Sequence, residues 1–182
     1  MSETTMVSLQ YPAHLLREHR LADGTTVTIR PIRHDDQAPE REFLNHLSQD
    51  TWYMRFHRFV AAPSDTLLHF LTDIDYDEHM AFVCTVRHGA AEEVVGEARY
   101  VVIPHSGKCD FGIMIADDWR KTGIAGLLME ALIRVARDRG LKAMEGLVLS
   151  SNLAMLRFAR ALGFKVQTMS DDPKTRLIVK KL

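Results

Sequence analysis

The chain has 182 residues, of which 46% are hydrophobic and 26% charged, which suits one globular domain and is short for two. Its formal net charge of -1 gives no electrostatic reason to expect nucleic acid or an anionic membrane as a partner. Residues 1–182 are therefore predicted to form a single domain, with residues 1–12 as a flexible N-terminus.

Neither a membrane segment nor a metal or disulfide framework is expected. No window approaches the ~20 apolar residues that a membrane-spanning helix needs, and the first residues do not form a secretory leader. Cys84 and Cys109 lie in predicted strands without a ligand spacing, and the histidines form no helical ligand pair. These features predict a cytoplasmic protein without a bound metal.

Strands predominate in the first two thirds of the chain. Asp23-Gly24 separates two strands and is typical of a hairpin turn, and Pro31 ends the second strand. Helices are predicted over residues 35–47 and, capped by Ser64, up to residue 71. Apolar and β-branched residues then predict strands over residues 79–87, 92–103 and 108–116.

Helices and strands alternate in the last third. An amphipathic helix is predicted up to Arg139, where Gly140 ends it, and a second over residues 152–162. The strands are predicted over residues 142–150, 164–169 and 175–182. Because a strand–helix–strand unit requires a crossover, the sheet must contain a parallel pair beside its antiparallel part. The predicted fold class is α/β (α+β), a mixed, mostly antiparallel sheet flanked by helices.

The loop that precedes the first of these helices, "DDWRKTGIAG", has the features of a phosphate site. A helix N-terminus presents unpaired backbone N–H groups and a positive dipole, so it binds phosphate where no side chain blocks the approach. Gly123, Ala125 and Gly126 leave the approach open, and Arg120 and Lys121 add positive charge. The spacing matches neither a Walker A loop nor G-x-G-x-x-G, so another phosphate-bearing ligand is indicated.

Two segments resemble the GNAT superfamily of acyl-CoA-dependent N-acyltransferases. Residues 120–125, Arg-Lys-Thr-Gly-Ile-Ala, resemble the signature Arg/Gln-x-x-Gly-x-Gly/Ala, and they lie between a strand and a helix as that signature does. "SNLAMLRFARALGF" is similar to the family's second cofactor segment, in which an Asn, here Asn152, precedes a helix closed by Gly163-Phe164. The resemblance covers about residues 24–170, with the usual tolerance on boundaries.

The resemblance implies a splayed sheet with acetyl-CoA, or another acyl-CoA, held in its opening. It implies that backbone groups on the strand over residues 108–116 pair with the pantetheine arm and that a backbone amide near Met114 polarises the thioester carbonyl. The amides of the loop would hold the pyrophosphate, and Asn152 would contact the cofactor arm. The implied cofactor-binding residues are Ile113, Met114, Ile115, Arg120, Lys121, Thr122, Gly123, Ile124, Ala125, Gly126 and Asn152.

A narrower resemblance concerns the acetyltransferase domain of bacterial protein lysine acetyltransferases. "LADGTTVTIRPIRHDD", "YMRFHRF" and "DIDYDEHMAFV" carry it. In those proteins a Glu on the strand before the phosphate loop acts as general base, and the matching residue here is Asp110. An amine with a reference pKa of about 10.4 must lose a proton before it attacks, so a carboxylate in a partly apolar cleft suits this role. The shorter side chain of Asp110 would work through a water relay.

Several of these residues have a second interpretation. The phosphate loop can be an ordinary strand-to-helix turn, Asn152 can act as a helix N-cap, and Asp110 can be a strand-end acid without a catalytic part. Many GNAT enzymes carry a Tyr that protonates the departing thiolate, and Ala159 occupies that position here. A thiol with a reference pKa of about 8.5 can leave without this help.

Charged residues elsewhere are mostly expected to be solvated. Arg55, His57 and Arg58 are predicted to be exposed charges beside a Trp-Tyr pair, with contact to substrate or to the CoA 3′-phosphate as the alternative. The acidic run of residues 73–78 is expected to form a solvated loop, the alternative being attraction of a cationic substrate. His79 beside it is a reserve candidate for the base.

The sequence thus predicts an acetyl-CoA-dependent N-acetyltransferase that works by direct attack of a primary amine on the thioester in a ternary complex. A protein lysine is the first candidate acceptor, and a small amine is close behind. A homodimer is left open, and neither nucleic acid nor a membrane is expected as a partner. Ala159 and the shortened acid keep one different class open, a GNAT-like domain that binds acetyl-CoA as a sensor without turnover.

Overall fold

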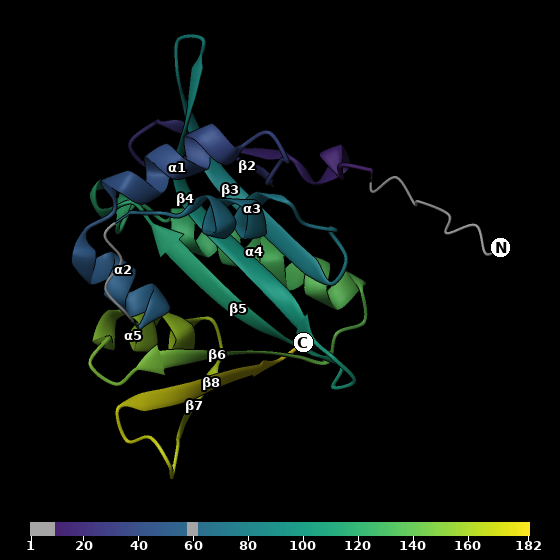
Figure 1. Cartoon of the computed structure of the whole chain (residues 1–182), viewed down its shortest axis with the longest axis vertical. Coiled ribbons are helices and arrows are strands. Elements are labelled where there is room, and N and C mark those ends of the chain that lie inside the picture. Colours follow the sequence, from purple (N-terminus) through teal and green to yellow (C-terminus); the bar gives the residue numbers. More distant parts are fainter. Residues whose placement is uncertain (1–9, 58–61) are drawn as a thin grey trace, which may run out of the picture.

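The computed structural model describes residues 10–57 and 62–182, which form an eight-stranded sheet in the order β1-β2-β3-β4-β5-β6-β8-β7 (Figure 1). The strands are β1 Arg17–Arg20, β2 Thr26–Pro31, β3 His79–His88, β4 Ala91–Ile103, β5 Lys108–Ile115, β6 Ala143–Leu149, β7 Lys165–Thr168 and β8 Thr175–Lys181. The α-helices are α1 Gln37–His46, α2 Gln49–Phe56, α3 Asp65–Thr72, α4 Ile124–Asp138 and α5 Leu153–Ala161, and short 3₁₀ turns cover Ala13–Leu15 and Asp117–Trp119.

The sheet is antiparallel except at one junction, where it splays. β5 and β6 run parallel for three residue pairs, from Lys108↔Ala143 to Asp110↔Glu145, and their pairing ends there. In Figure 1 the two strands leave a common region near the C-terminus and diverge toward α2 and α5. The predicted α/β class, with a mostly antiparallel splayed sheet and one parallel crossover, is confirmed.

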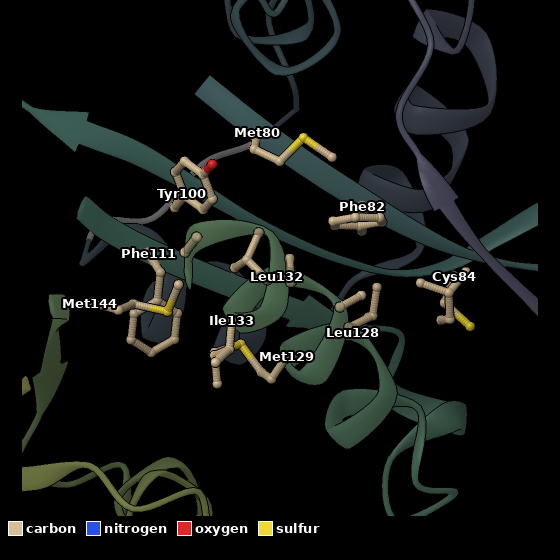
Figure 2. Close-up of a cluster of buried hydrophobic side chains, with 14 of the residues drawn as sticks. Met80, Phe82, Cys84, Tyr100, Phe111, Leu128, Met129, Leu132, Ile133 and Met144 are labelled. Atoms are coloured by element: carbon tan, nitrogen blue, oxygen red, sulfur yellow. The ribbon is translucent and has the colours of Figure 1, made fainter. Parts of the chain in front are cut away.

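Helix α4 covers one face of the sheet because its apolar residues recur with helical spacing. Leu128 and Leu132 are fully buried against side chains that alternate along β3, among them Met80, Phe82 and Cys84 (Figure 2). Successive side chains of a strand point to opposite faces, so each strand contributes every second residue to this layer. The helix therefore fixes the phosphate loop at its N-terminus against the middle of the sheet.

Helices α1, α2 and α3 lie with the other face, and α2 was not predicted. Ser48 caps α2 by accepting a hydrogen bond from the backbone N–H of Thr51 at 3.2 Å, and Trp52 is buried against α1. The cap residue was the available signal in the sequence, but eight residues are too few for a clear helical period. Ser64 caps α3 in the same way, as predicted.

The remaining predicted boundaries agree with the structure to within about two residues, the usual tolerance of such assignments. Residues 1–9 of the predicted flexible N-terminus lie outside the described residues. Tyr11, which belongs to the same predicted segment, is held in place: its hydroxyl donates to the Pro31 carbonyl at 3.0 Å, and its ring packs edge-on against Tyr76. Within the described ranges, no helix combines the length and apolarity that crossing a membrane requires.

Candidate active site

A cavity of about 850 Å³ fills the opening between β5 and β6. Its walls come from α2, β5, the phosphate loop, the first turn of α4, β6 and α5, and Ile178 of β8 adds to them. Most of the predicted cofactor residues line it, namely Ile113, Met114, Ile115, Arg120, Lys121, Gly123, Ala125, Gly126 and Asn152. Thr122, Ile124 and Asp110 do not.

The backbone of β5 is available for pairing on its open side. The N–H of Ala116 donates to the Val95 carbonyl of β4 at 2.9 Å, and in an antiparallel ladder every second residue turns its N–H and C=O to the same neighbour. Met114 shares the direction of Ala116 and therefore faces β4, whereas Ile113 and Ile115 face the opening. The amide of Met114 is thus turned away from the position in which we expected it to polarise a thioester.

The phosphate loop has an open approach. Gly123 is the N-cap of α4 with φ of 97°, a left-handed conformation that favours glycine. A side-chain carbon added at Gly123 or Gly126 would meet nothing within 4 Å, so side chains leave the approach to this turn open. The Gly126 N–H itself donates to the Gly123 carbonyl at 3.0 Å. The side chains of Thr122 and Ile124 are engaged elsewhere, because the Thr122 hydroxyl donates to the Trp119 carbonyl at 2.7 Å and Ile124 is buried in the core.

Arg120 links the phosphate loop to α2. Its Nη2 lies 2.7 Å from Oδ1 of Asp117 and donates to the Thr51 hydroxyl at 2.6 Å. Asp117 also accepts from the Ser48 backbone N–H at 2.9 Å, and these contacts lower the pKa of its carboxyl despite partial burial. Arg120 lines the cavity, but its charge is already balanced by Asp117, so Lys121 is the less encumbered cation of the pair.

Asn152 caps α5. Its side-chain oxygen accepts from the backbone N–H of Met155 at 3.1 Å, as one of the two interpretations predicted. Its side-chain amide remains available as a donor at the cavity wall. Ala159, at the position where many GNAT enzymes have a Tyr, is fully buried on the same helix and offers no proton donor.

Asp110 stands where the pairing of β5 and β6 ends, next to cavity residues Phe111 and Gly112. Its side chain keeps access to solvent, yet partial burial raises the pKa of the carboxyl above its usual value. Arg55 lowers this pKa and Glu145 raises it. A carboxylate with a raised pKa is a better proton acceptor than an ordinary surface Asp.

The prediction that Arg55 is a solvated charge is wrong. Helix α2 carries its side chain into the cavity wall, where the guanidinium lies directly over Gly112. His57 is exposed as the C-cap of α2, and Arg58 lies outside the described residues. The signal for Arg55 was the missed helix, whose register determines which of the neighbouring basic residues turns inward.

A buried cluster of ionisable groups adjoins Arg55 on the helix side of the sheet. Both carboxylate oxygens of Glu97 accept from Arg99 at 2.6 Å, and Arg99 also reaches the Leu71 carbonyl at 3.0 Å. Glu40 is fully buried beside Glu97, and its burial raises the pKa of its carboxyl well above the usual value. A proton on Glu40 makes this contact between two acids favourable.

His79 is a poor candidate for the base. Burial and the charge of Arg99 lower its pKa to about 4, and its Nε2 lies 2.9 Å from Nη1 of Arg99. Because Arg99 can only donate, Nε2 must accept, and its lone pair is occupied. The acidic run nearby is a loop in which Asp75 accepts from the backbone N–H groups of Asp77 and His79.

Comparisons with known proteins agree with this architecture. The family model described as acetyltransferase (GNAT) domain matches residues 26–165. The acetyltransferase PA5475 of Pseudomonas aeruginosa is 40% identical over 152 residues, which cover 84% of this chain and 82% of that protein. The acetyltransferase Pat of Mycolicibacterium smegmatis is 32% identical over 141 residues, 77% of this chain but 41% of that longer protein.

Two further likenesses concern a solved structure and a curated relative. The crystal structure of the GNAT domain of S. lividans PAT has a TM-score of 0.85, with 24% identity and coverage of 95% of this chain and 100% of that one. An L-methionine sulfoximine/L-methionine sulfone acetyltransferase of Pseudomonas aeruginosa is 34% identical over 85 residues, 44% of this chain and 49% of that protein. The matched family model and the extent of the likeness to PA5475 lead to one conclusion: the chain belongs to the GNAT family of acetyltransferases.

Proposed function

We propose that the protein transfers an acetyl group from acetyl-CoA to a primary amine by direct attack in a ternary complex. The observation that carries this proposal is the opening between β5 and β6, which begins at Asp110 and has the phosphate loop on its wall. Asp110 thereby places a proton acceptor next to one end of the cavity, and another part of the wall offers an open helix N-terminus. GNAT acetyltransferases use acetyl-CoA as their acyl donor, and these two features suit its thioester and its pyrophosphate.

The residues that would hold acetyl-CoA come from three segments. Ile113 and Ile115 turn their backbone groups into the opening and would pair with the pantetheine amides. The amides from Lys121 to Gly126 would hold the pyrophosphate, with Lys121 adding charge. The side-chain amide of Asn152 would donate to the cofactor arm.

The reaction needs a polarised carbonyl and a neutral amine. We assign the first task to the backbone N–H of Ile113 in place of Met114, because it faces the opening. Asp110 takes a proton from the amine, directly or through a water, as the nitrogen attacks the thioester carbon. A carbon–nitrogen bond forms, the carbon–sulfur bond breaks, and CoA leaves as a thiolate that takes a proton from solvent.

Two acceptor classes remain in the proposal. A protein lysine is favoured by the resemblance of this chain to the acetyltransferase domain of bacterial protein lysine acetyltransferases. A small amine is favoured by the likeness to the L-methionine sulfoximine/L-methionine sulfone acetyltransferase, over about half of that protein. The absence of a proton donor at Ala159 keeps acetyl-CoA sensing without turnover as a second function.

The test is CoA release from acetyl-CoA, with products identified by mass, using lysine peptides, an acyl-CoA synthetase, polyamines and amino acids as acceptors. Asp110→Asn should lower kcat by about 10²- to 10⁴-fold, the usual contribution of a general base, while the affinity for acetyl-CoA stays within a few-fold. Asp138→Asn, at the exposed end of α4, is the matched control and should behave as the wild type. Acetyl-CoA binding without turnover of any acceptor would favour the sensor.

A further inference from the structure

Arg55 is a partly buried cation that has no anionic partner among the residues the structure describes. Its Nε is inaccessible to solvent and has no hydrogen-bond partner, and no carboxylate of the described residues lies within ion-pair distance of its guanidinium. The contact that its charge makes is with the ring of its neighbour Phe56, 5.1 Å from the ring centroid. Burial of a guanidinium is unfavourable unless an anion compensates it. An anionic group of a bound ligand could therefore pair with this guanidinium.

The two acids whose charges act on Arg55 do not fill this role. Glu97 is engaged through both oxygens by Arg99, at 2.6 Å each. The charge of Asp110 partly offsets the lowering of the Arg55 pKa, but the two side chains form no ion pair. Among the described residues, the cavity wall thus carries a cation without an ion-pair partner, and a carboxylate without one lies beside the wall, next to Phe111.

The distance between these two charged groups indicates which ligand could contact both. Asp110 and Gly112 are two residues apart on one strand, so the side chain of Asp110 and the open position at Gly112 are on the same face, about 7 Å apart. The guanidinium of Arg55 lies over Gly112, on that face. A molecule with an amine and a carboxylate on one carbon atom can reach both groups, because its two polar ends are separated by two bonds and each adds the length of a hydrogen bond.

We propose that the acceptor is an α-amino acid whose carboxylate pairs with the guanidinium of Arg55 while its amine faces Asp110. This inference rests on the proposed function and selects the small amine from its two acceptor classes. The amine nitrogen attacks the thioester carbon, Asp110 receives the amine proton, and the products are an N-acetylamino acid and CoA. Arg55 fixes the acceptor's orientation, and its planar fork suits a carboxylate better than the point charge of a lysine does.

The first test needs no variant. Wild-type protein is assayed with each of the twenty common amino acids, and the best acceptor is compared with its α-carboxamide and with the amine that lacks the carboxylate. We expect kcat/KM to fall by about 10- to 100-fold for both analogues, the loss typical of one hydrogen-bonded charge pair. Acetylation of lysine peptides but of no free amino acid would overturn this inference and leave the proposed function intact.

The second test removes the guanidinium. Arg55→Gln should raise the KM for the amino acid by about 10- to 100-fold and change the KM for the carboxamide by less than about 3-fold, and Arg55→Lys should fall between Gln and the wild type. Arg134→Gln, on the exposed side of α4, controls for the loss of one positive charge. Equal losses with the amino acid and its carboxamide would overturn the inference, because Arg55 would then act on groups common to both acceptors.

Measuring acetyl-CoA binding distinguishes failure of the proposed function from failure of the acceptor inference alone. Measured calorimetrically on the wild type and on Arg55→Gln, it should be unchanged, which also shows that the variant is folded. If the wild type neither binds acetyl-CoA nor acetylates any acceptor, the proposed function fails and the inference fails with it. If it binds acetyl-CoA and acetylates an amine that carries no carboxylate as well as the best amino acid, the inference alone fails.

Discussion

Gly112 determines where the guanidinium of Arg55 can lie. A methyl group on Gly112 would overlap Cζ and Nη2 of that side chain, whereas the backbone of Gly112 is compatible with any residue. The atoms that would have to yield are the far end of a flexible side chain, not part of the sheet. Because Gly112 has a hydrogen atom in place of a side chain, the guanidinium of Arg55 fits against β5 at this point.

We therefore expect Gly112→Ala to reproduce the effect of Arg55→Gln. The displaced guanidinium should lose its contact with the acceptor carboxylate, raising the KM for the amino acid about 10-fold or more. The free energy of unfolding should change by no more than about 1 kcal/mol, since Arg55 can move. Steady-state kinetics with the amino acid and its carboxamide, together with urea unfolding, measures both quantities.

Gly96→Ala is the matched control for an added methyl group. It faces Leu128 and Ile115 on the opposite side of the sheet, where a carbon would lie 3.1 and 2.9 Å from their Cδ1 atoms. It should cost stability through overpacking and leave the preference for the amino acid over its carboxamide unchanged. A Gly112→Ala enzyme with the wild-type preference would argue against a role for Arg55 in acceptor binding.

At the scale of elements, the first turn of α4 contains Gly126, a weak helix former, where the helix borders the cavity. Gly126 lies inside the helix with an ordinary helical backbone, and its missing side chain leaves room at the cavity wall. Glycine inside a helix costs roughly 0.5–1 kcal/mol relative to alanine. The proposed pyrophosphate site accounts for a glycine that lowers the stability of its own helix.

Gly126→Leu should raise the stability of the protein and lower its affinity for acetyl-CoA. We expect the free energy of unfolding to rise by roughly 0.5–1 kcal/mol, because leucine is a good helix former, and the affinity for acetyl-CoA to fall at least about 10-fold, because the side chain fills the approach. Thermal unfolding and calorimetric titration check the two effects. Gly126→Ala gives the helix gain with a smaller obstruction. Wild-type affinity in the leucine variant would place the pyrophosphate elsewhere.

At the scale of the whole molecule, buried ionisable groups join the helical layer to the sheet. Glu40 of α1 lies against Glu97 of β4, and Arg99 of the same strand reaches the end of α3 through the Leu71 carbonyl. Arg99 lowers the pKa of Glu97, and burial together with the charge of Glu97 raises the pKa of Glu40. These opposite shifts favour a protonated Glu40 beside an ionised Glu97 in the folded protein.

This proton makes folding depend on pH. Because the pKa of Glu40 is higher in the folded than in the unfolded chain, its contribution to stability is complete below the unfolded value near 4.5 and declines as the pH rises from there toward the folded pKa. Glu40→Gln keeps a hydrogen-bond donor toward Glu97 and removes the titration. It should therefore be more stable than the wild type at pH 8 and lose that advantage near pH 4.5.

Urea unfolding over pH 4.5–8 measures this difference. Glu42→Gln, on the exposed side of the same helix, should keep the wild-type dependence on pH. A Glu40→Gln profile parallel to that of the wild type would mean that Glu40 is ionised in the folded protein. The prediction concerns the difference between the proteins, so other titrating groups such as Asp110 and His79 cancel.

Local signals in the sequence determined the strands, four of the five α-helices in the described part of the chain and the position of the phosphate loop. Alternating residues, the caps Ser64 and Asn152, and Gly123 before an amphipathic run are contiguous, so each can be interpreted without the rest of the chain. The resemblance to GNAT enzymes came from the same contiguous segments, and the matched family model confirms it. These features depend on the backbone preferences of neighbouring residues.

Only the tertiary structure decided which groups face the cavity. The direction of the Ile113 and Ile115 amides follows from the register of β5 with β4, and the raised pKa of Glu40 follows from its burial and from the charge of Glu97 beside it. Arg55 reaches Gly112 because the short helix α2, capped by Ser48, packs against the sheet beside β5. Each of these contacts joins residues far apart along the chain, and no local pattern records such a contact, because it depends on how complete elements pack.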